Sequence, residues 1–300
     1  MTYLFMGVVV LLYTAQSFLT RLYSARYPGN AENASPIFSI VSGVTVAVVS
    51  VAVCGFHFAA SPLTWLLGIL NALALILYNA TIIKASQTGP YSVLMVFSIA
   101  GGIIIPALVG AIAFGDNLTP MKVACILVVL ACVYLISDKD EQTKTRRGFW
   151  LAVSGLAIGN GLYGSLLDVQ QRITSVGEKE EMVAITFAAC ALISLLALGF
   201  KLKKQTLGAF KQTKMSLLYL IATSLVAAGA VHALTFVIDL IDLAVLYTFY
   251  CSGVLMLSVL CSAVFFGEKL SAKNIIGCIV MSVALVFMMG GDTLLAAWLS

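Results

Sequence analysis

Ten long apolar segments follow one another along this chain, and each has about the length of a membrane span. A helix needs roughly 20 mostly apolar residues to cross the hydrocarbon core of a bilayer. A scan with that length places the segments at approximately 3–20, 36–56, 63–84, 91–114, 120–137, 149–167, 182–200, 216–238, 243–266 and 273–290. Backbone groups in lipid must be paired within the segment, which requires helices here. The sequence therefore predicts an all-α integral membrane protein with ten transmembrane helices.

Charged residues are too scarce to cover a soluble globule of this length. Only 10% of the 300 residues are charged and 61% are hydrophobic, whereas soluble domains carry about 25% charged residues. The net charge of +4 is spread over several loops, so we expect no nucleic-acid partner. Because the first segment lacks a basic stretch ahead of its apolar run, we interpret it as a span and not as a signal peptide.

The second half of the chain repeats part of the first half. Residues 91–134 align without a gap on residues 243–286, which lie 152 positions further on, and Gly101 matches Gly253. A hydrophilic turn is also repeated, since FGDNLT at 114–119 corresponds to FGEKLS at 266–271. The final Thr or Ser of each turn suits the N-cap of the next helix.

Each half of the chain contains five predicted spans. We therefore divide the chain into a first five-helix repeat at 1–137, a polar connector at 138–147 and a second five-helix repeat at 148–300. Five is an odd number, so the second repeat enters the membrane in the opposite direction to the first. Two inverted repeats around a site near the midplane are typical of secondary transporters.

In these repeated residues the sequence resembles the drug/metabolite transporter superfamily, specifically its EamA-type branch. The resemblance rests on residues 88–137 and 244–287, where an apolar helix, an FGE-L-S/T turn and a closing apolar helix occur twice. Asp116 departs from the Glu that the family usually has, and Cys125 stands where the second copy has the more typical Gly277. The resemblance implies transport of a small metabolite but does not fix which one.

The absence of other motifs narrows the mechanism. The chain has no GxxxxGK[ST] phosphate-binding motif, and its seven cysteines show no CxxC or metal-ligand spacing. We expect no cofactor, no metal and no enzymatic activity. The favoured function is secondary transport by alternating access, in the export direction. The expected substrate is a small polar or amphipathic metabolite such as an amino acid or a drug-like compound. A lipid flippase and an intramembrane enzyme remain the alternatives.

Polar and aromatic residues near the middle of several spans are the candidate substrate-binding residues. An amide without a partner in hydrocarbon costs several kcal/mol, so such side chains point either to another helix or into a wet cavity. In the resembled family, the first, third, fourth, sixth, eighth and ninth spans line the central pathway, which favours the cavity. The candidates are Gln16, Tyr78, Asn79, Ser98, Asn160, Tyr163, His232, Tyr247 and Tyr250, with Tyr13 on the same helix face as Gln16.

Two candidates have more specific predicted roles. His232 is the most ionisable residue at depth. It is either a cavity residue that binds substrate or couples protons, or a neutral histidine bonded across a helix contact. Pro106 lies inside the fourth span, where it predicts a kink. That kink is either a hinge for alternating access or a site of close helix packing. The uncharged remainder suits a neutral or zwitterionic ligand.

The Lys and Arg residues indicate an orientation. Fourteen lie in one alternating set of loops and three in the other, and the positive-inside rule then puts both termini outside the cytoplasm. The family resemblance implies the opposite orientation. We expect a plasma (inner) membrane protein of a prokaryote whose partners are a small-molecule substrate, the lipid bilayer and, through His232, protons. The oligomeric state is not fixed by the sequence.

Overall fold

All the secondary structure of the described residues is helical. The computed structural model describes residues 2–29, 31–115, 119–137, 148–173, 178–202, 211–238, 250–251, 253–254, 257–258, 260–261, 263–265, 271–273, 275–284 and 287. The helices are α1 (Thr2–Arg26), α2 (Ala31–Val53), α3 (Pro62–Thr88), α4 (Tyr91–Phe114), α5 (Pro120–Ser137), α6 (Phe149–Ile173), α7 (Lys179–Leu202) and α8 (Lys214–Ile238). Further helical turns occur between 250 and 287, including a shorter apolar helix at Ile275–Ala284.

The structure confirms a helical membrane protein. Seven of the described helices, all except α5 among the eight labelled ones, are long and apolar enough to cross a bilayer. A 25-residue helix such as α1 is about 37 Å long, which exceeds the hydrocarbon thickness. Large apolar side chains are exposed on the outside of the bundle, with Ile112 84% and Leu151 75% exposed. Soluble proteins rarely expose so much apolar surface, whereas contact with lipid accounts for it.

The start of α2 corrects one predicted boundary. The predicted span begins at Pro36, but the helix begins at Ala31, so Pro36 lies inside it. Proline has no N–H to bond the carbonyl of Glu32, four residues earlier. The Lys201 ammonium of α7 donates a hydrogen bond to that same carbonyl. The helix therefore begins one turn before the predicted span, and a side chain from another helix supplies the donor that Pro36 lacks.

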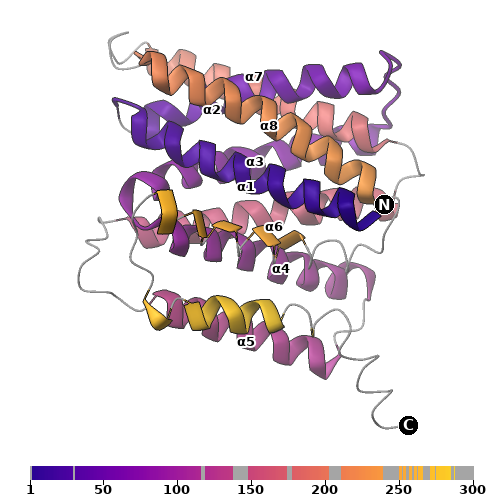
Figure 1. Ribbon diagram of the computed structural model, residues 1–300. Helices are drawn as coiled ribbons and strands as arrows, with labels where there is room; N and C mark the ends of the chain where they lie inside the picture. The colour runs from indigo at the N-terminus through magenta and orange to yellow at the C-terminus, as the bar shows by residue number, and fades with distance from the viewer. Residues whose placement is uncertain are drawn as a thin grey trace.

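The helices form one bundle of roughly antiparallel rods (Figure 1). In that view α2, α7 and α8 lie on one side, α1 and α3 lie in the middle, and α4, α6 and α5 follow. Successive helices alternate in direction, so the ends of α1, α3 and α7 share one end of the bundle. We name it the basic end, for Arg21, Lys84 and Lys201. The opposite end, with Glu178 and Glu180 at the start of α7, is the acidic end.

Glycines allow α3, α4 and α6 to pack closely against one another. A Cβ added at Gly101 of α4 would overlap the Ala157 carbonyl of α6, and one at Gly159 would lie 2.7 Å from the Tyr78 backbone nitrogen of α3. These backbones are therefore in direct contact, as small residues allow in membrane helices. We call α3, α4 and α6 the first group.

The helix turn at Gly253 packs on α1 in a looser way. A Cβ added at Gly253 would lie 2.7 Å from the Cγ1 atom of Val10, which is a side-chain contact. Helix α1 also packs along α8. We call α1, α8 and the described turns at 250–254 the second group. Helices α2 and α7 pack against each other beside the two groups, at Gly43 and the Phe187 carbonyl.

Candidate functional site

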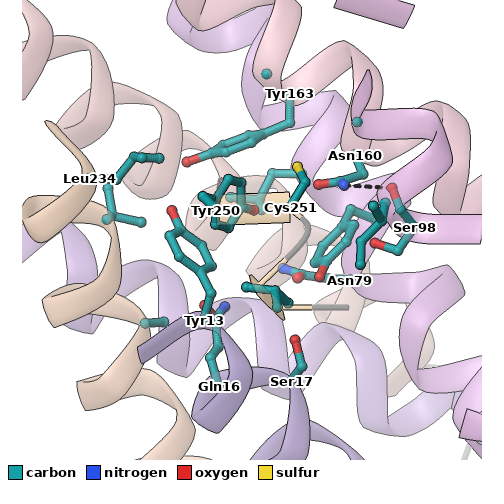
Figure 2. A pocket seen from close by; sticks show the side chains of 18 of the residues that line it. Tyr13, Gln16, Ser17, Asn79, Ser98, Asn160, Tyr163, Leu234, Tyr250 and Cys251 are labelled. Atoms are coloured by element: carbon teal, nitrogen blue, oxygen red, sulfur yellow. Dashed lines mark hydrogen bonds between the residues drawn. The ribbon is translucent and has the colours of Figure 1, made fainter. Parts of the chain in front are cut away.

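A cavity with polar walls lies in the middle of the bundle, between the two groups (Figure 2). Its volume is about 90 Å³. Its lining comes from α1, α2, α3, α4, α6, α7 and α8 and from the turns at 250–254, and mid-helix residues such as Ser42 and Gly102 contribute to it. A position near the middle of spanning helices is a position near the centre of the bilayer.

The cavity brings together seven of the nine predicted substrate-binding residues. They are Gln16, Tyr78, Asn79, Ser98, Asn160, Tyr163 and Tyr250. Tyr13, Ser17, Ser42 and Cys251 also line it and were not among the nine. Ser17 lies four residues after Tyr13 on the same face of α1, so the helical period alone could have identified it. Tyr247 lies outside the described residues.

The first group contributes a hydrogen-bonded wall. The Asn160 amide of α6 donates from Nδ2 to the Ser98 carbonyl of α4 at 2.8 Å (Figure 2). A Cβ added at Gly102 would lie 2.8 Å from that Nδ2 atom, so the glycine leaves room for the amide. This bond fixes the amide plane, and the amide oxygen is the part of Asn160 left to accept a bond from a ligand.

Pro106 adds a backbone acceptor to the same wall. The proline has no N–H for the carbonyl of Gly102, one turn earlier in α4, and Gly102 lines the cavity. On its other side the proline ring packs toward α6, where a Cβ added at Gly164 would lie 3.8 Å from its Cγ atom. Pro106 is therefore at a close helix contact, and its predicted role as a hinge stays a prediction.

The second group contributes an aromatic wall. The rings of Tyr13 and Tyr250 pack with their centroids 4.9 Å apart and their planes tilted by 53°. One turn along α1, the Oε1 atom of Gln16 is buried and has no hydrogen-bond partner among the described residues. A buried amide oxygen without a partner is costly unless a ligand or water completes it. A ligand that carries a hydrogen-bond donor would therefore be stabilised next to Gln16.

The rest of the cavity is apolar or bonded within the protein. Asn79 donates from Nδ2 to the Ser39 hydroxyl at 3.1 Å, and Ser42 donates to the Phe38 carbonyl at 2.7 Å. Leu75 and Phe187 supply apolar surface. No Asp, Glu, Lys, Arg or His is found among the described residues that line the cavity. A neutral or zwitterionic ligand fits such a lining better than an ion does.

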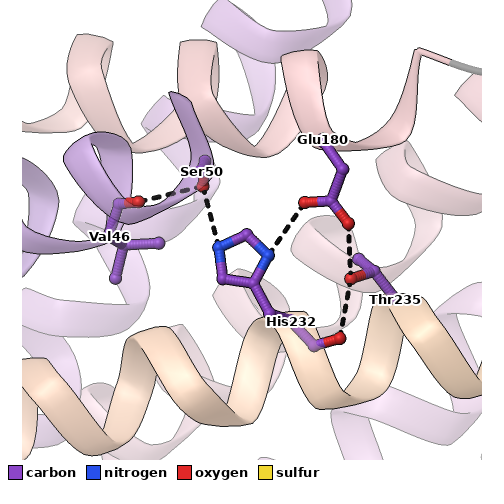
Figure 3. Close-up of polar contacts among 5 residues, drawn as sticks. All are labelled: Val46, Ser50, Glu180, His232 and Thr235. Carbon is purple, nitrogen blue, oxygen red and sulfur yellow. Dashed lines mark hydrogen bonds and ion pairs between the residues drawn. The ribbon is translucent and has the colours of Figure 1, made fainter. Parts of the chain in front are cut away.

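His232 lies outside this cavity and belongs to a separate polar cluster near the acidic end (Figure 3). Its Nδ1 atom is 2.8 Å from Glu180 Oε2, and its Nε2 atom is 3.2 Å from the Ser50 hydroxyl. Thr235 donates to Glu180 Oε1 at 2.9 Å. The cluster ties α2, α7 and α8 together. The predicted role of His232 in lining the cavity is therefore not supported, because its neighbour Val231 occupies the cavity-facing position.

Both ring nitrogens of His232 face oxygen atoms of the cluster. The Ser50 hydroxyl, which donates to the Val46 carbonyl at 2.9 Å, lies 3.2 Å from Nε2. The Nδ1 atom and the Glu180 carboxylate lie 2.8 Å apart but are not aligned for a hydrogen bond. Because the carboxylate can only accept, it would stabilise a ring proton on Nδ1.

At the basic end α1 and α3 are bonded together. Arg21 of α1 donates from Nη1 to the Ser86 carbonyl and, at 3.1 Å, to the Gly89 carbonyl at the end of α3. Ser24 donates to the Ile83 carbonyl at 3.1 Å, and Gln87 donates to the Ser24 carbonyl at 3.2 Å. A cation at the C-terminus of a helix is also favoured by the helix dipole. These bonds close the basic end between the first and second groups.

No family model matches the chain, and no curated protein matches it. The fold itself has been seen before. A solved structure described only as "Crystal structure of protein" is similar to this chain, with a TM-score of 0.65 and 17% sequence identity. The similarity covers 100% of this chain and 98% of the other. At that identity the similarity shows a shared fold over the whole length and gives no information about function.

Proposed function

We propose that the protein is a secondary transporter that binds a small neutral or zwitterionic metabolite, such as a small amino acid, in the central cavity. The observation that carries the proposal is a cavity with polar, uncharged described walls at the mid-depth of a membrane bundle, between two groups of helices. Secondary transporters commonly bind substrate near the midplane, where two related units meet. The EamA-type resemblance of the sequence points to the same activity.

The geometry supports a pair of inverted five-helix repeats. Gly101 and Gly253, 152 positions apart, approach α6 at Ala157 and α1 at Val10, and these two contact residues are 147 positions apart. The start of α3 is capped by Ser61 and Thr64, and the start of α8 by Thr213 and Ser216, again 152 positions apart. Further pairs 152 apart line the cavity, namely Leu75 and Ala227, Asn79 and Val231, Ser98 and Tyr250, Ile99 and Cys251, and Gly102 and Val254.

The ends of the bundle support alternating access. Under the repeat relation, the contact of α1 with α3 corresponds to a contact of α6 with α8. The first pair is bonded at the basic end, whereas the described parts of α6 and α8 are not among the closely packed helix pairs. With the basic end in the cytoplasm, as the positive-inside rule favours, this conformation is closed to the cytoplasm of a prokaryotic inner membrane.

The size of the cavity limits the ligand. A cavity of about 150 Å³ holds benzene, and the central cavity, at about 90 Å³, is smaller. In this conformation it suits a compact metabolite, and a bulky drug-like compound or a lipid headgroup would need a wider one. This favours the metabolite over the flippase alternative.

Transport into reconstituted vesicles tests the proposal. A panel of radiolabelled small amino acids and other polar metabolites is offered with and without a proton gradient. We expect uptake by the unchanged chain and by Ser165→Ala, a control on α6 outside the cavity lining, and loss of uptake in Asn160→Leu. No flux of any compound, or equal flux in both variants, contradicts the proposal.

A further inference from the structure

A second, larger cavity lies away from the central one, as a groove between α2, α3 and α7. Its volume is about 410 Å³. It is formed by the first half of α2 and by the later parts of α3 and α7, so it lies toward the basic end. Its lining residues on α3 are half-buried, and those on α7 range from the buried Ser194 to the exposed Ala197, as expected at the edge of a bundle. None of the transport steps proposed above uses this groove.

The lining of the groove changes from apolar to basic along its length. Ile76 of α3 and Ile193 of α7 lie at its inner part, nearer the middle of the bundle. Lys84 and Lys201 line its outer part, each eight residues further along the same helix. Eight helical residues correspond to about 12 Å. The groove therefore has a charged end and an apolar end, as an amphiphile does.

The charged end is suited to an anion. Neither Lys84 nor Lys201 forms an ion pair with a carboxylate among the described residues. Lys201 is held in place by its bond to the Glu32 carbonyl that Pro36 leaves without a helical donor. That bond uses one of three ammonium donors. Glu32 also lines the groove but is exposed, so the two lysines leave a net charge of +1 there.

We propose that this groove binds an anionic phospholipid from the leaflet at the basic end. The lysine ammonium groups hold the phosphate, the hydroxyls of Ser35 and Ser194 offer further hydrogen bonds, and an acyl chain lies over Ile76 and Ile193. A free anion would use only the charged end and leave the apolar part empty. Anionic lipids are concentrated in the cytoplasmic leaflet, on the side where the basic loops are expected.

A lipid in this groove would contact Ser39, which holds a side chain of the central cavity in place. Ser39 lines the groove, and its hydroxyl accepts the hydrogen bond from Asn79, which lines the cavity. One hydrogen bond thus spans the wall between the two spaces. The binding proposal does not depend on transport, because lipid binding is measured directly.

Native mass spectrometry of the full chain in detergent tests the proposal. Phosphatidylglycerol and phosphatidylcholine with the same acyl chains are added in parallel, and inorganic phosphate is added in a third series. We expect retained adducts with phosphatidylglycerol, at least several-fold more than with phosphatidylcholine, and none with phosphate. The double variant Lys84→Gln/Lys201→Gln should lose this preference and bind the two lipids about equally, since each lysine near an anionic surface contributes several-fold.

A matched pair of lysines provides the control. Lys211 and Lys214 are exposed near the same end and do not line the groove, so Lys211→Gln/Lys214→Gln should keep the preference. A third variant, Ala197→Leu, fills the groove and keeps both lysines, and it should reduce adducts of both lipids. Equal binding of the two lipids to the unchanged chain, equal loss in both lysine variants, or unchanged binding in Ala197→Leu would each overturn the proposal. The filled variant decides the matter if the Lys84/Lys201 variant does not fold.

Discussion

Under the proposed repeat relation, the two walls of the central cavity occupy corresponding positions, but they differ in chemistry. Asn160 and Ser98 form the first wall through a hydrogen bond of 2.8 Å. Tyr13 and Tyr250, which lie 147 positions before Asn160 and 152 after Ser98, form the second through packed rings. A similar backbone frame can thus present an amide on one side and aromatic faces on the other. A ligand between them meets two different surfaces and has one preferred orientation.

Packing within the two helix groups should give the largest difference. Gly101→Ala forces a methyl group into the Ala157 carbonyl, which is backbone, whereas Gly253→Ala meets the movable side chain of Val10. We expect Gly101→Ala to lower the free energy of unfolding by about 3 kcal/mol and Gly253→Ala by about 1 kcal/mol. Thermal unfolding in detergent measures both. Equal shifts would mean that the two groups are packed alike.

Ligand affinity should distinguish the two walls next. Asn160→Leu removes the bond to Ser98 and the acceptor offered to the ligand, for a loss of about 2 kcal/mol, or about 30-fold in Kd. Tyr250→Phe keeps the ring contact with Tyr13 and should change Kd by less than about threefold. Calorimetric titration with the metabolite found in the flux screen measures both. A larger effect of Tyr250→Phe would assign the dominant polar contact to the second wall.

Gln16 and Tyr163 lie 147 positions apart and correspond under the proposed repeat relation, but their replacement should affect stability differently. The Gln16 amide oxygen has no described partner, so Gln16→Leu should leave the unfolding temperature unchanged or higher while weakening ligand binding about tenfold. Tyr163 does have an interaction partner, so Tyr163→Leu should lower both the unfolding temperature and the affinity for the ligand. Unfolding temperature and Kd are measured on the same preparations. A destabilised Gln16→Leu protein would show that the amide supports the fold.

The smallest expected effect concerns the starts of α3 and α8, which correspond under the proposed repeat relation. Hydrogen bonds from Thr64 and Ser61 hold the pKa of Glu178 below its ordinary value of 4.5, whereas the start of α8 has Gln212 in contact with Ser216. Because the folded pKa is the lower one, Glu178 stabilises the fold above about pH 4.5 and loses this effect as the pH falls further.

Unfolding temperatures between pH 6 and pH 3.5 test this difference. The decrease on acidification should be smaller in Glu178→Gln than in the unchanged chain, and Gln212→Asn should leave it as it was. The effect should be smaller than those of the three preceding comparisons, because Glu178 is only half-buried and water screens its hydrogen bonds. An identical acid response in Glu178→Gln would show that its hydrogen bonds contribute nothing to the fold.

The sequence predicted the helices and much of the cavity because both follow from polarity in lipid. Asn160 and Gln16 are amides in apolar segments, and the hydrocarbon leaves few places for an amide to point. The start of α2 was not predictable, because the donor that makes Pro36 tolerable comes from Lys201, far along the chain. His232 was placed in the cavity by depth alone, whereas its partner Glu180 lies at a helix start, where a carboxylate needs no special explanation.

The backbone contacts at Gly101 and Gly159 limit how this molecule can change shape. Helices that touch through their backbones cannot approach each other further, so we expect α3, α4 and α6 to move as one rigid body. Under the proposed transport, shape can change only along the seam where this rigid body meets α1 and α8. A tilt that parts α1 from α3 at one end of the seam presses α6 toward α8 at the other. The movement that opens the pathway at one end of the bundle therefore closes it at the other, so the two ends are not open at the same time.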